Sequence, residues 1–159
     1  MLLAIFTDIH ANRQAFAACL EAARARGADR LICLGDIVGY GADPEWSVDT
    51  VMEMVAAGGL AVRGNHDNAV STASETMNAE AQAAMEWTRG RLSAEQRRFL
   101  AELPMSVGDE DRLFVHAEAS SPPRWRISRA SRARSGGARP RWPRPMRRRW
   151  PGGRARPCR

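Results

Sequence analysis

The sequence contains no lysine, so all 24 of its basic residues are arginines. It also lacks a long apolar run, because no stretch approaches the ~20 residues that a membrane-spanning helix needs. The first residues, M-L-L-A-I-F-T-D, have neither the basic start nor the small-residue cleavage site of a signal peptide. From these absences we expect neither membrane insertion nor a membrane partner.

Cysteine is also scarce, and its three positions form no paired disulfide framework. Cys19 and Cys33 fall within apolar segments, and Cys158 lies next to the C-terminal residue. We therefore expect buried thiols in a reducing compartment, which predicts a cytoplasmic protein.

Acidic residues are missing from the last quarter of the chain. All 18 lie at or before Glu118, whereas 14 of the 24 arginines lie from Arg124 onward. Residues 1–123 hold 10 basic and 18 acidic side chains, a formal charge of −8, and residues 124–159 hold 14 arginines with no opposing charge. This segregation predicts a domain over residues 1–123 and a separate arginine-, proline- and glycine-rich tail over residues 124–159.

Apolar runs in the acidic part are typical of buried strands. They predict strands at residues 2–8, 30–36, 60–67 and 112–117. Helical segments separate the first three strands and precede the fourth. Strands joined by crossover helices indicate an α/β fold with a largely parallel sheet and helices on its faces.

Capping residues mark where the helices should begin. Asn12, Asp43 with Pro44, Asn78 and Ser93 each precede a helical segment. Gln96 stands three residues after Ser93, the spacing of a capping box. The helix after Asn12 is expected to end at Gly27 and to place four side chains on one apolar face: Phe16, Cys19, Leu20 and Ala23.

Polar side chains gather where the predicted strands end. Asp8 and His10 follow the first strand and Asp36 ends the second; the others are Asn65, His66 and Asp67 after the third strand and His116 after the fourth. In parallel α/β sheets ligands bind at the carboxyl edge, because the loops converge there. The three histidines of the chain all fall at this edge.

These residue types suit a pair of divalent cations. Carboxylate, amide oxygen and imidazole together accommodate manganese, iron, zinc or nickel. Asp8 and His10 point to one side if the strand end is extended, and the carboxylate of Asp36 can bridge two cations. Taken singly, each residue has an ordinary alternative: a surface histidine at His10, a hydrogen-bonded structural histidine at His116, and turn residues at Asp36 and Asn65.

Four motifs in order, D-I-H, G-D-I-V, G-N-H-D and V-H-A, resemble those of the calcineurin-like metallophosphoesterase superfamily. The segments T-D-I-H-A-N and L-G-D-I-V-G-Y-G are similar to its small bacterial phosphodiesterase-type branch. The resemblance covers about residues 1–125. It implies the N-terminal part of an αββα sandwich and hydrolysis of phosphodiesters or phosphomonoesters by a hydroxide that two metals activate.

The resemblance also implies a role for each residue. Asp8 and His10 would bind the first metal, Asn65 and His116 the second, and Asp36 would bridge both. His66 would lie beside the leaving-group oxygen of the phosphoester substrate as an acid or electrostatic stabiliser, with Asp67 orienting its imidazole. The expected cofactors are two divalent ions, manganese before iron, zinc or nickel.

One expected motif is missing from the sequence. The family carries a fifth motif, G-H-x-H, with one histidine for each metal, and no histidine follows His116. Residues 124–159 contain no Asp, Glu or His, so Cys158 is the only side chain there that could replace one. We therefore expect impaired activity.

The tail has two interpretations. Arg, Pro, Gly and Ala supply 27 of its 36 residues, which is typical of a GC-rich gene read out of frame, and the chain would then be truncated or frameshifted. Alternatively, arginines interleaved with tryptophans bind nucleic acid electrostatically and the protein is catalytically inactive. Loss of later strands would also leave a sheet edge uncovered, so we expect self-association.

Overall fold

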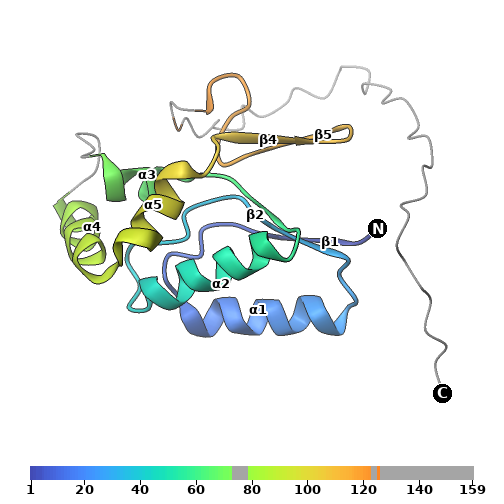
Figure 1. The fold of residues 1–159 in the computed structure, drawn as a ribbon, viewed down its shortest axis with the longest axis horizontal. Coiled ribbons are helices and arrows are strands. Elements are labelled where there is room, and N and C mark those ends of the chain that lie inside the picture. Colours follow the sequence, from blue (N-terminus) through green and yellow to red (C-terminus); the bar gives the residue numbers. More distant parts are fainter. Residues whose placement is uncertain (73–78, 123–124, 126–159) are drawn as a thin grey trace, which may run out of the picture. The chain divides into compact units, whose positions relative to one another are not determined.

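Three short parallel strands form the central sheet of the computed structural model, which describes residues 1–72, 79–122 and 125. They are β1 (Leu3–Phe6), β2 (Arg30–Cys33) and β3 (Leu60–Ala61), in the order β1-β2-β3. Leu3 of β1 pairs with Arg30, and Cys33 at the end of β2 pairs with both neighbours. The two crossovers are helical, which confirms the predicted α/β fold (Figure 1).

Helices α1 (Arg13–Ala25) and α2 (Pro44–Ala56) cover one face of this sheet (Figure 1). The cap predicted at Asn12 is present, because its side-chain Oδ1 accepts a hydrogen bond from the N–H of Ala15 at 3.0 Å. Pro44 occupies the first turn of α2, as predicted. The main core lies between these helices and the sheet, and its fully buried members include Cys33, Val48 and Val51.

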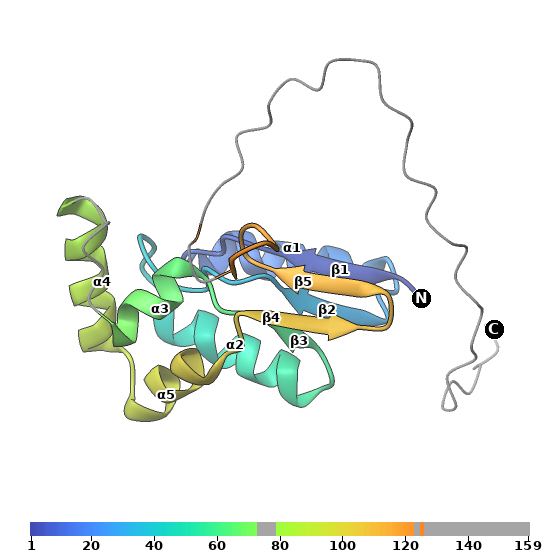
Figure 2. The same cartoon turned by 90° about the horizontal axis from the view of Figure 1, so that it is seen from above.

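A β-hairpin lies against the opposite face of the sheet. Its strands are β4 (Ser106–Asp109) and β5 (Arg112–Val115), which pair antiparallel (Figures 1 and 2). Phe114 of β5 packs with Ile32 and Val62 in a second, smaller core. Successive residues of β2 therefore serve different cores, with Ile32 toward the hairpin and Cys33 toward the helices, as the pleat of a strand requires.

Three helices link β3 to the hairpin: α3 (Asn65–Ser71), α4 (Ala79–Arg91) and α5 (Ala94–Glu102). The predicted capping box is present at the start of α5. Ser93 Oγ accepts the N–H of Gln96 at 3.1 Å, and Gln96 Oε1 accepts the N–H of Ser93 at 3.0 Å. The cap predicted at Asn78 and the tail predicted over residues 124–159, apart from Trp125, lie outside the described residues.

Three expectations are corrected. The strand predicted at residues 60–67 ends at Ala61, and Asn65 already begins α3. The strand predicted at residues 112–117 belongs to the antiparallel hairpin, whose first strand we did not predict. Cys19 is exposed on α1, whereas Cys33 is buried as expected. Across the described residues, every helix is too short or too polar to span a membrane.

Candidate metal centre

The loops that follow β1 and β2 lie side by side and carry the first three polar residues of the site. The N–H of Asp8 donates to the carbonyl of Gly35 at 3.1 Å, and the N–H of His10 donates to the carbonyl of Asp36 at 2.9 Å. Asn65 and His66 stand in the first turn of α3. These backbone hydrogen bonds join the two loops independently of any side-chain contact.

The backbone of these loops is strained at the functional positions. Asp8, His10 and Asp36 have φ values of 54°, 48° and 54°, in the left-handed region that residues other than glycine avoid. Each such residue costs about 1–3 kcal/mol and persists only where its surroundings hold it. Strain concentrated on three polar residues of one cluster is typical of a functional site.

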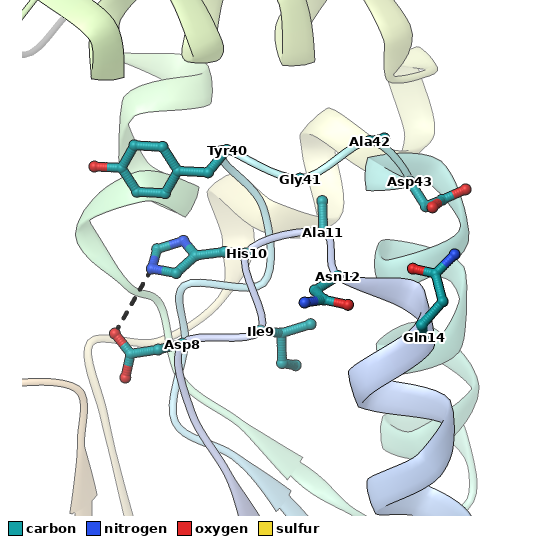
Figure 3. Close-up of a pocket in the computed structure, with 10 residues that line it drawn as sticks. All are labelled: Asp8, Ile9, His10, Ala11, Asn12, Gln14, Tyr40, Gly41, Ala42 and Asp43. Atoms are coloured by element: carbon teal, nitrogen blue, oxygen red, sulfur yellow. Dashed lines mark ion pairs between the residues drawn. The ribbon is translucent and has the colours of Figure 1, made fainter.

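His10 presents its Nε2 to two carboxylates. Its Nδ1 lies 3.2 Å from the carbonyl of Val38, to which it donates, and this contact fixes the ring. Nε2 then lies 3.8 Å from Asp8 Oδ1 and 3.8 Å from Asp36 Oδ2 (the Asp8 contact is dashed in Figure 3). The other oxygen of Asp8 accepts the hydroxyl of Thr7 at 2.6 Å.

His116 is oriented in the same way from the far side of the cluster. Its Nδ1 donates to the carbonyl of Leu34 at 2.7 Å, and its Nε2 lies 3.5 Å from Asp36 Oδ2 and 3.3 Å from Asn65 Oδ1. Burial alone would lower the pKa of His116, but its hydrogen bond to Asp36 and the charge of that carboxylate raise it to about 9. The site therefore stabilises a positive charge between these two side chains.

Asp36 stands at the centre of the cluster. Its Oδ2 faces the Nε2 atoms of both His10 and His116, and its Oδ1 accepts the N–H of His66 at 2.9 Å. Burial would raise the pKa of Asp36, but the hydrogen bond and charge of His116 and the N–H of His66 lower it below its usual value. The buried carboxylate is therefore held in its ionised form.

The residues fit divalent cations. The potential ligand atoms of His10, Asp36 and His66 lie within 4.8 Å of one another, and so do those of Asp8, Asp36 and His116. His10 and His116 each donate Nδ1–H to a backbone carbonyl and turn Nε2 to the carboxylates, as metal-binding histidines do. Asp36 belongs to both groups, which is the position of a bridging ligand.

The two groups differ from the expected division of ligands. His66 lies within ligand range of His10 and Asp36, although the resemblance places it outside the first coordination sphere. Asp8 belongs to the group of potential ligands that contains His116, and it also lies beside His10. Asn65 lies beside His116, with its Oδ1 3.3 Å from the Nε2 of that ring.

Asp67 does not orient His66 in the way that the sequence led us to expect. Its Oδ2 accepts the N–H groups of Asp36 and Gly64, and its Oδ1 those of Ile37 and Val38, at 2.9 to 3.3 Å. Burial and the charge of Asp36 raise the pKa of Asp67 to about 6, while these backbone donors limit the rise. Asp67 therefore organises the backbone around Asp36.

His66 itself is buried beside Gly39. Its Nδ1 has no hydrogen-bond partner among the described residues. Burial lowers the pKa of the imidazole, and the attraction of Asp36 does not offset the effect. The neutral ring is therefore favoured.

Two glycines that our sequence interpretation did not single out make this packing possible. A Cβ at Gly39 would come within 2.5 Å of His66 Nδ1, and a Cβ at Gly64 would overlap the carboxylate and backbone nitrogen of Asp36. Both stand inside the quoted motifs, at G-Y-G and G-N-H-D. Glycines within these motifs were the signal in the sequence that could have indicated close packing at the site.

A pocket of about 580 Å³ opens beside the cluster. Its lining, drawn in Figure 3, comes from the β1–α1 and β2–α2 loops and the start of α1: Asp8, Ile9, His10, Ala11, Asn12, Gln14, Tyr40, Gly41, Ala42 and Asp43. Asp8 and His10 thus belong to both the candidate metal centre and the pocket. A ligand in the pocket would therefore reach these two side chains directly.

Comparison with known proteins agrees with this geometry. The profile of the calcineurin-like phosphoesterase superfamily domain matches residues 1–139. The chain belongs to this superfamily. Its members are metal-dependent phosphoesterases, and the match extends beyond the boundary that we placed at residue 123.

Two relatives show how much of a longer protein this chain corresponds to. The uncharacterized protein MJ0912 of Methanocaldococcus jannaschii is 33% identical over 130 residues, 78% of this chain and 52% of that protein. The metallophosphoesterase from Sphaerobacter thermophilus is 36% identical over 76% of this chain and 48% of its own, with a TM-score of 0.60. The chain thus spans about half the length of these two relatives.

A third similarity concerns the fold alone. The hypothetical protein PH1004 from Pyrococcus horikoshii is 21% identical, with a TM-score of 0.61 over 69% of this chain and 50% of that one. Similarity of this kind places the α/β layers in a known architecture.

Proposed function

We propose that the chain hydrolyses phosphoesters, diesters or monoesters, with two divalent cations held around Asp36. One observation carries the proposal: a single buried oxygen, Asp36 Oδ2, faces the Nε2 atoms of two histidines whose Nδ1 atoms are already engaged with backbone carbonyls. Ion pairs in structural networks do not need this orientation, whereas metal ligands do.

The proposed ligands divide into two sets that share Asp36. Asp8 and His10 would hold one cation, and Asn65 and His116 the other. Manganese is the first choice, because two imidazoles, carboxylates and an amide oxygen suit a borderline ion better than magnesium or calcium. Bound cations would supply charge for the phosphoryl oxygens and acidify a water to serve as the nucleophile.

The remaining polar side chain acts on the leaving group. His66, held by its own N–H on Asp36 and packed against Gly39, would donate a hydrogen bond to the departing oxygen. Because its neutral form is favoured, the imidazole would stabilise the developing charge through this N–H hydrogen bond, without carrying a positive charge of its own.

Turnover by the 159-residue chain should be slow. No histidine follows His116 in the sequence, so each cation would keep its carboxylate but lack one imidazole that the superfamily supplies. Loss of even an outer-shell partner costs ~10 to 100-fold in affinity or activity. We therefore expect weak manganese binding and a low rate on activated aryl phosphodiesters.

The test compares Asp36→Asn with Asp109→Asn. Asp109 pairs with Arg30 at 3.0 Å, at the opposite end of β2 from the site, so it controls for the loss of a partly buried carboxylate. Manganese binding, followed by electron paramagnetic resonance, and manganese-dependent hydrolysis of bis(p-nitrophenyl) phosphate should both disappear in Asp36→Asn and persist in Asp109→Asn. Equal binding and activity in the two variants would refute the proposed centre.

A further inference from the structure

Tyr40 is an unusual residue in the lining of the pocket beside the candidate metal centre. Its side chain is exposed to 59% and its backbone adopts a φ of 59°, a left-handed conformation that costs a tyrosine free energy. An aromatic ring that is both exposed and strained contributes little to the core. Its position therefore calls for another explanation.

The ring of Tyr40 lies beside two histidines of the candidate metal centre. Its ring centroid lies 5.0 Å from that of His10 and 4.8 Å from that of His66, and the two imidazoles are themselves 4.8 Å apart (Figure 3 shows Tyr40 and His10). If His66 faces the leaving-group oxygen, the group attached to that oxygen lies beside the exposed ring.

The loop holds Tyr40 firmly in this place. Gly41 follows it, and the N–H of Gly41 donates to the carbonyl of His10 at 2.9 Å. A Cβ at Gly41 would overlap the backbone of His10 and Ala11, so only glycine lets the two loops approach this closely. The backbone that carries the ring is thus fixed before a ligand arrives, which lowers the entropy cost of binding.

The charge of the pocket selects against a second anion. Among the described residues its lining includes the carboxylates of Asp8 and Asp43 and no arginine, and the side chains of Asn12 and Gln14 offer neutral polar groups. With Asp8 engaged by a cation, a leaving group with its own phosphates would still meet the carboxylate of Asp43 and no basic side chain of this lining. A neutral group with hydrogen-bonding edges would not be repelled.

We propose that this pocket binds a neutral, planar aromatic group on the leaving alcohol of the phosphoester, with Tyr40 as its stacking surface. The inference rests on the proposed function and adds its substrate class. A volume of about 580 Å³ holds a group of nucleoside size, and a simple aryl alcohol would fill only part of it. Stacking on an exposed aromatic side chain is worth roughly 1–3 kcal/mol per base, or about 5-fold to 150-fold in affinity.

The experiment separates binding from catalysis. Binding of adenosine and of phenol, with ribose and cyclohexanol as non-aromatic counterparts, is measured by saturation-transfer NMR on the full chain without added metal. Hydrolysis is measured with manganese on aryl and alkyl phosphodiesters matched for the acidity of the leaving alcohol. The variants are Tyr40→Phe, which keeps the ring, and Tyr40→Leu, which keeps bulk and backbone strain without it.

Trp87→Leu serves as the matched control. Trp87 is an exposed aromatic residue on α4, at 48%, and does not line the pocket. We expect adenosine to bind more tightly than phenol and both more tightly than the non-aromatic compounds. The wild type, Tyr40→Phe and Trp87→Leu should share this preference, and Tyr40→Leu should lose it by about 10-fold.

Each outcome has a distinct meaning. Manganese-dependent hydrolysis with no aromatic preference, or a preference unchanged in Tyr40→Leu, would overturn this inference and leave the proposed function intact. Aromatic binding that depends on Tyr40, in a protein without manganese-dependent hydrolysis, would overturn the proposed function and support the pocket. If phenol binds as tightly as adenosine, the aromatic binding surface is supported and simple aryl alcohols are identified as its ligands.

Discussion

Asp36 and Asp67 each accept a hydrogen bond from the backbone segment that carries the other. Asp67 Oδ2 receives the N–H of Asp36, and Asp36 Oδ1 receives the N–H of His66, both at 2.9 Å. The loop after β2 and the first turn of α3 are therefore joined in both directions. A carboxylate proposed to touch cations is positioned by a second one buried behind it.

Asp67→Asn should weaken this connection. The two oxygens of Asp67 now accept four backbone N–H groups, and the amide keeps only one acceptor oxygen, so its NH₂ group would face two of these donors. Leaving buried donors unpaired costs ~1–3 kcal/mol, and we expect a loss of that order in the free energy of unfolding. Urea denaturation measures it, and Asp109→Asn should lose less.

Gly39→Ala should disturb the site, whereas Gly58→Ala should not. Both glycines have left-handed backbones, with φ of 102° and 93°, but a Cβ meets His66 at Gly39 and nothing within 4 Å at Gly58. Both variants should lose stability from strain, by about 1–2 kcal/mol at Gly58. Weaker manganese binding is expected only for Gly39→Ala, and an equal effect of the two substitutions would contradict the contact with His66.

Cys19 and Cys33 should differ sharply in reactivity. Burial raises the pKa of the Cys33 thiol to about 12, whereas Cys19 is exposed on α1. Only the thiolate reacts with iodoacetamide, so at mildly alkaline pH Cys33 should stay unmodified until the protein unfolds. Peptide mass spectrometry after brief labelling gives the answer, and rapid modification of Cys33 in the folded protein would show that its surroundings open.

Ile5 should promote self-association. It is 52% exposed on β1, which pairs only with β2 in the described part of the sheet, and Leu2, just before this strand, is 48% exposed. A free strand edge beside apolar side chains is a template for pairing with another chain. Ile5→Arg should reduce the concentration dependence of sedimentation, while Ala17→Arg on the exposed side of α1 adds the same charge and should change nothing.

Local signals in the sequence predicted the helix starts well. The caps at Asn12 and Ser93 depend on side chains that bond to backbone three residues away, so the pattern contains the whole interaction. The third strand was overextended because we did not recognise Asp67 as the residue that caps α3. Its Oδ2 accepts the N–H of Gly64, three residues earlier, and Asp67 also accepts N–H groups of the loop after β2, so the chain turns into α3 at this point.

The hairpin was missed for a similar reason. Ser106–Asp109 is short, contains Gly108 and has no apolar run, and only its pairing with Arg112–Val115 makes it a strand. The direction of pairing leaves no trace in a period-two pattern. Cys19 lies at the margin of the apolar stripe of α1, and the periodicity did not show how wide a face the sheet would cover.

The identities of the site residues were visible in the motifs, but their connections were not. The structure brings Asp8, His10, Asp36, Asn65 and His116 to one place through contacts of backbone groups far apart in the chain. The role of Asp67 depends on which N–H groups surround it after folding. Tyr40 was quoted in a motif without a function, because its exposure and backbone conformation appear only in three dimensions.

The left-handed backbones at Asp8, His10, Asp36 and Tyr40 set stability and chemistry against each other at the same positions. Glycine adopts this conformation without strain, so each substitution to glycine would remove a local cost while deleting a functional side chain. A library of variants sorted only for thermal resistance should accumulate glycine where the side chain is exposed, as at Asp8 and Tyr40, but not at Asp36, whose carboxylate accepts the buried N–H of His66. Sorting the same library for phosphoester turnover should purge it, and the positions where the two selections disagree would outline the site without a substrate in hand.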